Sequence, residues 1–226
     1  MLFNSLPFLV LLAATFTLFH LPPLRRGQTL VLIAASLVFY AWEAPWLLLL
    51  LIGSILTNTL ISRLVASGPV PRLARVMVAG LLFNLSLIGL FKYGALAASS
   101  LGLSDRGVGH TLVTLPLPIG ISFYTFESIS LLVDLFRHRR RGEPSFIPDG
   151  GWRHLEHTAL FVAFFPHLIS GPILKADRFY PQIGPKRFRD IHWNCAFKLC
   201  VLGFFLKMVV ATTLRTPPPA WPTRSF

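Results

Sequence analysis

The sequence predicts an all-α, polytopic integral membrane protein with about six to seven helices and one re-entrant segment. Of its 226 residues, 54% are hydrophobic and 13% are charged, whereas soluble domains average about 25% charged residues. Its Lys and Arg residues outnumber Asp and Glu by 21 to 9, and they gather in short stretches between long apolar runs. Basic loops of that kind orient a membrane protein, so the composition excludes a soluble domain and favours the lipid bilayer over nucleic acid as the partner.

The first half of the chain contains four apolar runs that are long enough, or nearly so, to cross a bilayer. The first run ends at Pro22, and Pro45 opens the third because a helix tolerates proline in its first turn. We expect residues 94–110, which are rich in Gly and Ser, to form a loop. The runs cover residues 3–21, 28–42, 46–65 and 75–93.

A fifth run, residues 111–136, ends on the basic cluster 137–141. Because basic loops face the cytosol, this cluster and the arginines near residues 25, 63 and 72 predict one consistent topology. In that topology the N-terminus is periplasmic.

Residues 155–174 break the alternation of sides. If this run crossed the membrane, the basic stretch 175–189 would lie outside, against the rule. The run also contains Pro166, Gly171 and Pro172, which interrupt helical hydrogen bonding, and broken backbone at membrane depth needs protein or water around it. We therefore predict a re-entrant segment with both ends cytosolic, followed by an outward span over residues 192–214.

Polar side chains interrupt the apolar runs at a few positions. Tyr124, Glu127, Ser130 and Asp134 fall on one helical face, which must look into the protein because charges in lipid are costly. This face could line a cavity or proton path, or it could hydrogen-bond a neighbouring helix, with Asp134 at the cytosolic interface. Asn58 and Asn84 are also intramembrane residues, and they are expected to hold helices together.

Three histidines require an interpretation. His154 and His157 are spaced as metal ligands could be, but no third ligand is suitably placed, so we expect an interfacial position and no metal. His167 lies inside the broken segment, where it could act as a hydrogen-bonding anchor or as a catalyst.

Motifs of soluble enzymes are absent, but four strings of the sequence resemble the membrane-bound O-acyltransferase family, in particular its bacterial branch that acetylates alginate. The similarity runs in order along most of the chain. The strings are residues 35–42 (ASLVFYAW), 117–127 (LPIGISFYTFE) followed by Asp134, 164–173 (FFPHLISGPI) with 179–182 (FYPQ), and 203–211 (GFFLKMVVA).

The resemblance implies a helical bundle around a tunnel in the bacterial inner membrane. It implies transfer of an acetyl group from acetyl-CoA, with no bound cofactor, toward an exported polysaccharide or a periplasmic acetyltransferase partner. A histidine would act as general base on the acceptor hydroxyl. The tunnel-lining candidates are Tyr124, Glu127, His167, Lys175 and Gln182.

The sequence departs from the family after residue 211. The family's characteristic histidine lies downstream of the last of these strings, residues 203–211, and none of the seven histidines in this chain occupies that position, so the catalytic residue is unknown. We expect residues 1–211 to form the N-terminal part of the bundle, and the Pro-rich residues 212–226 to mark a truncation or frameshift. The chain alone is then expected to be inactive.

Two other functions are compatible with the residues. A transporter or flippase could use Glu127 and the broken segment as a proton-coupled path. A non-catalytic membrane scaffold could dock a periplasmic acetylation partner without binding acetyl-CoA.

Overall fold

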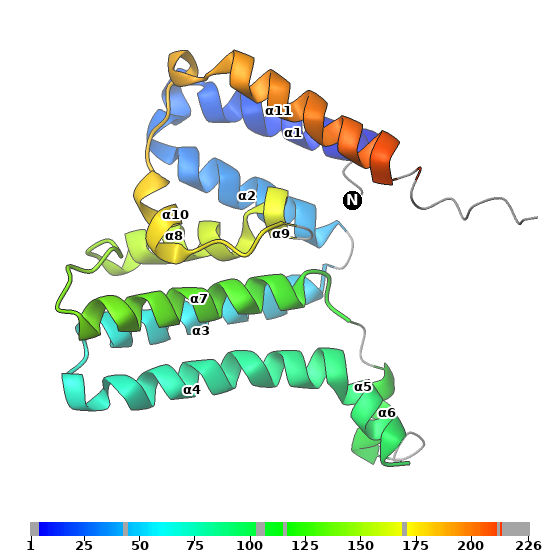
Figure 1. The fold of residues 1–226 in the computed structure, drawn as a ribbon, viewed down its shortest axis with the longest axis vertical. Helices are drawn as coiled ribbons and strands as arrows, with labels where there is room; N and C mark the ends of the chain where they lie inside the picture. The colour runs from blue at the N-terminus through cyan, green and yellow to red at the C-terminus, as the bar shows by residue number, and fades with distance from the viewer. Residues whose placement is uncertain are drawn as a thin grey trace, which may run out of the picture. The chain divides into compact units, whose positions relative to one another are not determined.

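A computed structural model describes residues 5–42, 45–102, 107–114, 117–168, 171–211 and 213. Every regular element in these ranges is helical (Figure 1), in agreement with the predicted all-α class. The chain divides into two units, residues 1–185 and 186–226. Each unit is described separately.

The first two helices form a sharp bend. Helix α1 (Leu6–His20) is followed by the 3₁₀ turn η1 (Pro22–Gly27) and by α2 (Gln28–Ala41), with an angle of 97° between the two halves. Phe8 of α1 packs its ring against those of Phe39 and Phe165, each with a centroid separation of 6.0 Å. This aromatic contact ties the bend to a distant part of the chain.

Three long helices pack side by side in the first unit (Figure 1). Helix α7 (Ile121–Arg140) contacts both α3 (Leu47–Ser67) and α4 (Val70–Ile88). Asn58 and Asn84, both fully buried, exchange side-chain hydrogen bonds of 3.2 and 2.7 Å between α3 and α4. The prediction that these asparagines join helices is confirmed.

The loop expected at residues 94–110 is wrong for residues 94–100 and 107–110, which are helical, whereas residues 103–106 lie outside the described part of the chain. Helix α4 continues through the π turn η2 (Gly89–Tyr93) into α5 (Gly94–Ser100), and α6 covers Gly107–Thr114. Gly and Ser suggested a break, but three alanines in α5 favour the helix. The expected run 111–136 is split, because α7 begins only after Pro118 and the left-handed Gly120.

A broken helical segment completes the first unit. Helix α8 (Gly151–Ala163) ends at Phe164, and α9 (Phe165–Leu168) makes a single turn. An irregular stretch, residues 171–175, leads to α10 (Ala176–Phe179) and the 3₁₀ turn η3 (Tyr180–Gln182).

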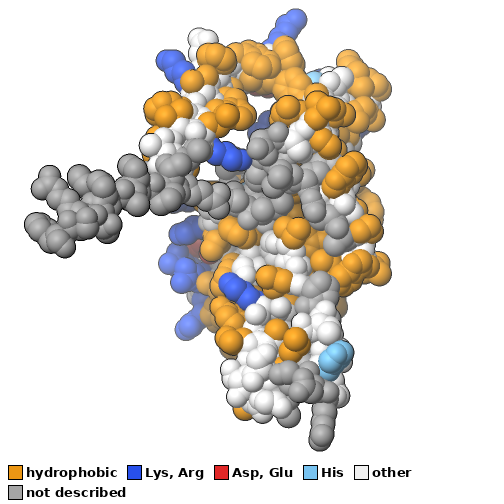
Figure 2. All heavy atoms as spheres, turned by 90° about the vertical axis from the view of Figure 1, so that its right-hand side faces the viewer, with side chains coloured by type: hydrophobic (Ala, Val, Ile, Leu, Met, Phe, Trp, Pro, Cys, Tyr) orange, Lys and Arg blue, Asp and Glu red, His pale blue; other side chains and the backbone are white. Residues whose placement is uncertain are grey.

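In the described ranges, fewer helices qualify as membrane spans than the six to seven expected from the sequence. In the described ranges, three helical stretches are long and apolar enough to cross a membrane, namely Leu47–Ser67, Arg72–Ser100 and Trp193–Val210, and the bent α1–α2 pair makes up to four. Helices α1 and α2 are each too short to span alone, and α7 is too polar. Hydrophobic side chains cover much of the face shown in Figure 2, as expected for a multi-pass membrane protein.

The second unit contains the 3₁₀ turn η4 (Phe188–Asp190), α11 (Trp193–Phe205) and the π turn η5 (Leu206–Val210). Within this unit the side chains of α11 are exposed and mostly apolar. Apart from Thr213, the predicted Pro-rich tail lies outside the described residues.

Candidate functional site

The last part of the broken segment folds back onto α8. The Tyr180 ring stacks edge-on against His157 in the middle of α8, with centroids 5.7 Å apart. The Tyr180 hydroxyl lies 3.0 Å from Thr158 Oγ1. The chain after α9 therefore folds back along α8, and the re-entrant segment over residues 155–174 stays a prediction.

Side chains of α7 and α2 satisfy the backbone where this segment is not helical. Ser130 Oγ donates to the Leu174 carbonyl at 3.2 Å, and Asp134 Oδ2 accepts from the Ala176 amide at 3.2 Å. Ser36 Oγ of α2 accepts from the Phe165 amide at 3.2 Å. Asp134 is only 8% exposed and accepts from the first turn of α10, which favours the hydrogen-bonding alternative for this face of α7.

Glu127 and His167 form a buried pair between α7 and α9. Glu127 Oε1 lies 2.8 Å from His167 Nε2, and the Glu127 side chain is fully buried. The same nitrogen lies 3.3 Å from the Phe161 carbonyl. In the tautomer that carries its proton on Nε2, this nitrogen donates toward these two oxygens. This geometry favours the anchoring alternative for His167.

Gly120 brings the start of α7 against the end of α9. Its φ of 74° is left-handed, and a Cβ at this position would lie 2.5 Å from the Leu168 carbonyl oxygen. Only glycine can adopt this left-handed backbone and lie this close to the Leu168 carbonyl without strain. Two of the strings that carry the family resemblance, 117–127 and 164–173, therefore meet in space through Gly120 and through the Glu127–His167 pair.

Two buried tyrosine hydroxyls lie in the same core. Tyr40 of α2 and Tyr124 of α7 are 5% and 0% exposed and belong to one hydrophobic cluster. Neither hydroxyl has a hydrogen-bond partner among the described residues. Buried polar atoms without partners often mark the place of a water molecule or a ligand. Sequence reasoning missed Tyr40, although it lies in the string 35–42.

The five tunnel candidates do not come together. Tyr124, Glu127 and His167 are buried at the junction of α7 with the broken segment. Lys175 and Gln182 are exposed, and the Gln182 amide donates to the Arg178 carbonyl at 2.8 Å.

His154 lies buried between α8 and α3. This side chain is 1% exposed, and its Nε2 lies 2.7 Å from Ser62 Oγ of α3. Burial, helped by the charge of Arg63, lowers the pKa of His154 to about 4. Its imidazole is therefore neutral and joins α8 to α3.

Comparison with known proteins found curated relatives but no matching family model and no matching solved structure. The chain is 34% identical over 219 residues to the probable alginate O-acetylase AlgI of Pseudomonas aeruginosa and 39% identical over 220 residues to that of Azotobacter vinelandii. It is 32% identical over 199 residues to the peptidoglycan O-acetyltransferase of Helicobacter pylori. These alignments cover 80–95% of the chain.

The chain spans about 40% of the length of the relatives that it matches. The matched part includes a multi-pass helical bundle and a broken segment that is hydrogen-bonded to α7. This chain is a homologue of the alginate O-acetylases along 95% of its own length.

Proposed function

We propose that this protein is a membrane-bound O-acetyltransferase that passes acetyl groups toward a polysaccharide. The observation that carries the proposal is the similarity to curated O-acetyltransferases along nearly the whole chain. The predicted re-entrant segment supports it, because such a segment places polar groups at a depth where an acyl group could cross between the two faces.

In this proposal the donor is cytosolic acetyl-CoA and the membrane is the bacterial inner membrane, with the N-terminus in the periplasm. The orientation follows from the basic clusters, which should face the cytosol. In the reaction, the acceptor hydroxyl oxygen bonds to the acetyl carbon, the carbon–sulfur bond breaks, and the thiol of coenzyme A leaves with a proton. The acetyl group leaves the membrane on the polysaccharide itself or on a periplasmic acetyltransferase partner.

Glu127 and His167 have a positioning role in this proposal. Their contact fixes α9 against α7, beside the unpartnered hydroxyls of Tyr40 and Tyr124. We place the acyl path along these tyrosines.

A chimera tests the function. The aligned segment of the Pseudomonas aeruginosa alginate O-acetylase is replaced by this chain in a strain that lacks the native protein. O-acetyl groups on the secreted alginate are then measured by NMR. We expect acetylation to be restored, and a chimera that inserts stably into the membrane but leaves the alginate unacetylated would count against the proposal.

The same chimera tests the Glu127–His167 pair. Glu127→Ala removes the acceptor, and breaking a buried pair of this kind costs about 3–5 kcal/mol, so acetylation should fall. Glu127→Gln keeps an acceptor oxygen and should retain more activity. Phe126→Leu is the matched control, because Phe126 is the preceding residue and is 42% exposed.

A further inference from the structure

An apolar cleft opens between helices α2, α3 and α8 of the first unit. Its volume is about 230 Å³, and all but one of the residues that line it are apolar. Ile55 and Ala159 line it as buried residues, whereas Leu30, Leu56 and Trp152 line it as exposed residues. The cleft is therefore closed at its floor and open toward the surroundings of the bundle. We call it the lateral cleft.

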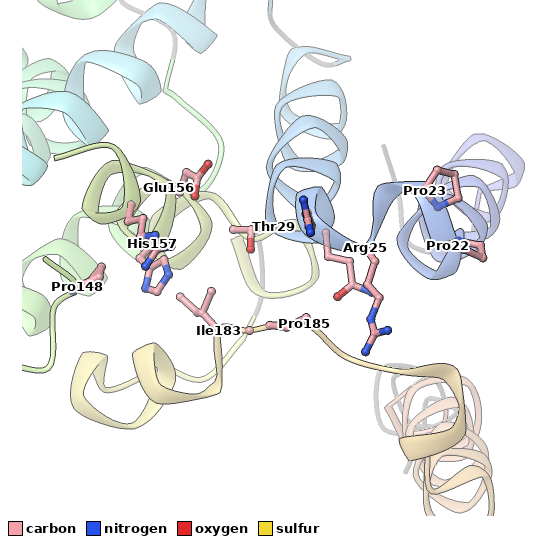
Figure 3. A pocket seen from close by; sticks show the side chains of 13 residues that line it. Pro22, Pro23, Arg25, Thr29, Pro148, Glu156, His157, Ile183 and Pro185 are labelled. Carbon is pink, nitrogen blue, oxygen red and sulfur yellow. The ribbon is translucent and has the colours of Figure 1, made fainter. Parts of the chain in front are cut away.

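Arginine side chains from α8 and from the turn before α2 gather beside the lateral cleft. Glu156 lines both the cleft and a larger pocket of about 1040 Å³, so the two are adjacent. Figure 3 shows this pocket, with Arg25 projecting from η1 and Glu156 from α8. Arg26 and Arg153 also line it. Three guanidinium groups and one carboxylate therefore border the cleft on this side.

Helix α3 contributes a fourth arginine near the start of α8. The Arg63 guanidinium lies against Gly151, the first residue of α8, and the next residue, Trp152, lines the cleft. All four arginines are exposed, and none makes an ion pair within the described part of the chain. Such guanidinium groups suit a phosphate, because each can donate two parallel hydrogen bonds to it. The distribution of basic residues predicts that this end faces the cytosol.

We propose that the lateral cleft holds an acyl chain of an anionic phospholipid from the cytosolic leaflet, with the lipid phosphate bound by the neighbouring arginines. Charge complementarity identifies the occupant, because basic pockets between membrane helices on the cytosolic side bind anionic headgroups. Phosphatidylcholine would place a trimethylammonium group beside these arginines, whereas phosphatidylglycerol carries only negative charge. The apolar lining suits the acyl chain, and Trp152 has the side chain that prefers the membrane interface. This inference does not depend on the proposed function.

Native mass spectrometry of the purified chain, released from vesicles with equal amounts of phosphatidylglycerol and phosphatidylcholine, tests the proposal. We expect phosphatidylglycerol to stay bound in preference to phosphatidylcholine. One arginine near the membrane surface changes the affinity for an anionic lipid about fivefold. Arg63→Gln and Arg153→Gln should therefore each lower the ratio of bound phosphatidylglycerol to phosphatidylcholine about fivefold. Arg72→Gln is the control and should leave the ratio unchanged, because Arg72 is an exposed arginine that lines neither the cleft nor the pocket.

A second pair of variants tests the cleft itself. Ala159→Leu adds a larger side chain to the floor of the cleft and should remove bound lipid of both kinds. Ala79→Leu adds the same volume on the exposed side of α4 and should leave binding unchanged. Thermal unfolding in detergent shows whether Ala159→Leu is folded. If it is not, the exposed arginines still decide the question, because their replacement leaves the packed core intact.

Three results would overturn the assignment. A ratio that falls as much with Arg72→Gln as with Arg63→Gln and Arg153→Gln would show a general attraction of the basic surface for anionic lipid. Equal lipid binding by folded Ala159→Leu and Ala79→Leu would place the lipid outside the cleft. A chain that carries no lipid would leave the cleft without this occupant, and a dimer that Ala159→Leu dissociates would give the cleft to a second copy of the chain.

Discussion

Replacing Gly120 by alanine should destabilise the junction between α7 and the broken segment. The left-handed backbone at Gly120 costs a residue with a Cβ about 1–2 kcal/mol. The new Cβ would also lie 2.5 Å from the Leu168 carbonyl oxygen, and relieving that overlap requires a backbone shift that costs about 1–3 kcal/mol. We expect a total of about 3 kcal/mol.

Thermal unfolding of the purified chain in detergent, followed by tryptophan fluorescence, measures this effect. For a chain of this size, about 3 kcal/mol corresponds to a decrease in Tm of about 6–12 °C.

Two glycines separate the contributions at Gly120. Gly102 has a φ of 67°, and no atom lies within 4 Å of the position that a Cβ would take there, so Gly102→Ala reports the backbone cost alone. Gly53 is helical and also has free space, so Gly53→Ala should be neutral or stabilising by up to about 1 kcal/mol. If Gly120→Ala lowers Tm no more than Gly102→Ala, the close approach to Leu168 is refuted.

Three further substitutions test other contacts of the bundle. A double-mutant cycle of Asn58→Ala and Asn84→Ala should give a coupling of about 1 kcal/mol in unfolding measurements, and additive effects would contradict the paired hydrogen bonds. Asp134→Ala should lower the free energy of unfolding by about 1–3 kcal/mol because it leaves the Ala176 amide buried without its acceptor. Asp134→Asn keeps an acceptor oxygen, so equal losses of stability in the two variants would contradict the role of Asp134 as acceptor. The pKa of His154 is lowered to about 4, so below about pH 6.5 the unfolded chain binds more protons than the folded one. The free energy of unfolding should therefore decrease as the pH falls from about 6.5 to about 4, by up to about 1.4 kcal/mol per pH unit. His154→Gln should flatten that profile, and an unchanged slope would show that other groups control it.

The helical class and most helix positions follow from the sequence because lipid imposes them. Long apolar runs have few other structures available at membrane depth, and the runs 28–42 and 46–65 agree closely with α2 and α3. The prediction fails at residues 94–100, where three alanines outweigh the Gly and Ser residues that suggested a loop. It also treats α1 and α2 as separate spans, although the 97° bend joins two helices that are each too short.

The site could be predicted in part. The inward face of α7 follows from helical spacing, since charged side chains avoid lipid. The pairing of Glu127 with His167 depends on how the broken segment folds back, which residue spacing does not encode. The position of His154 is unpredictable for the same reason, because its partner Ser62 is 92 residues away in the chain.

The polar face of α7 supplies hydrogen-bond partners that the broken segment needs. Without helical hydrogen bonds, residues 171–176 need outside partners, and Ser130 and Asp134 provide two of them. Glu127 is engaged by His167, so three of the four polar side chains that suggested a proton path have structural partners. On this face the Tyr124 hydroxyl and Glu127 Oε2 have no hydrogen-bond partner among the described residues, and neither does the hydroxyl of Tyr40 on α2. In the proposed function, a path for the acyl group beside α7 would therefore draw its hydrogen bonds from Glu127 Oε2, from the Tyr124 hydroxyl one helical turn away, and from the Tyr40 hydroxyl of α2.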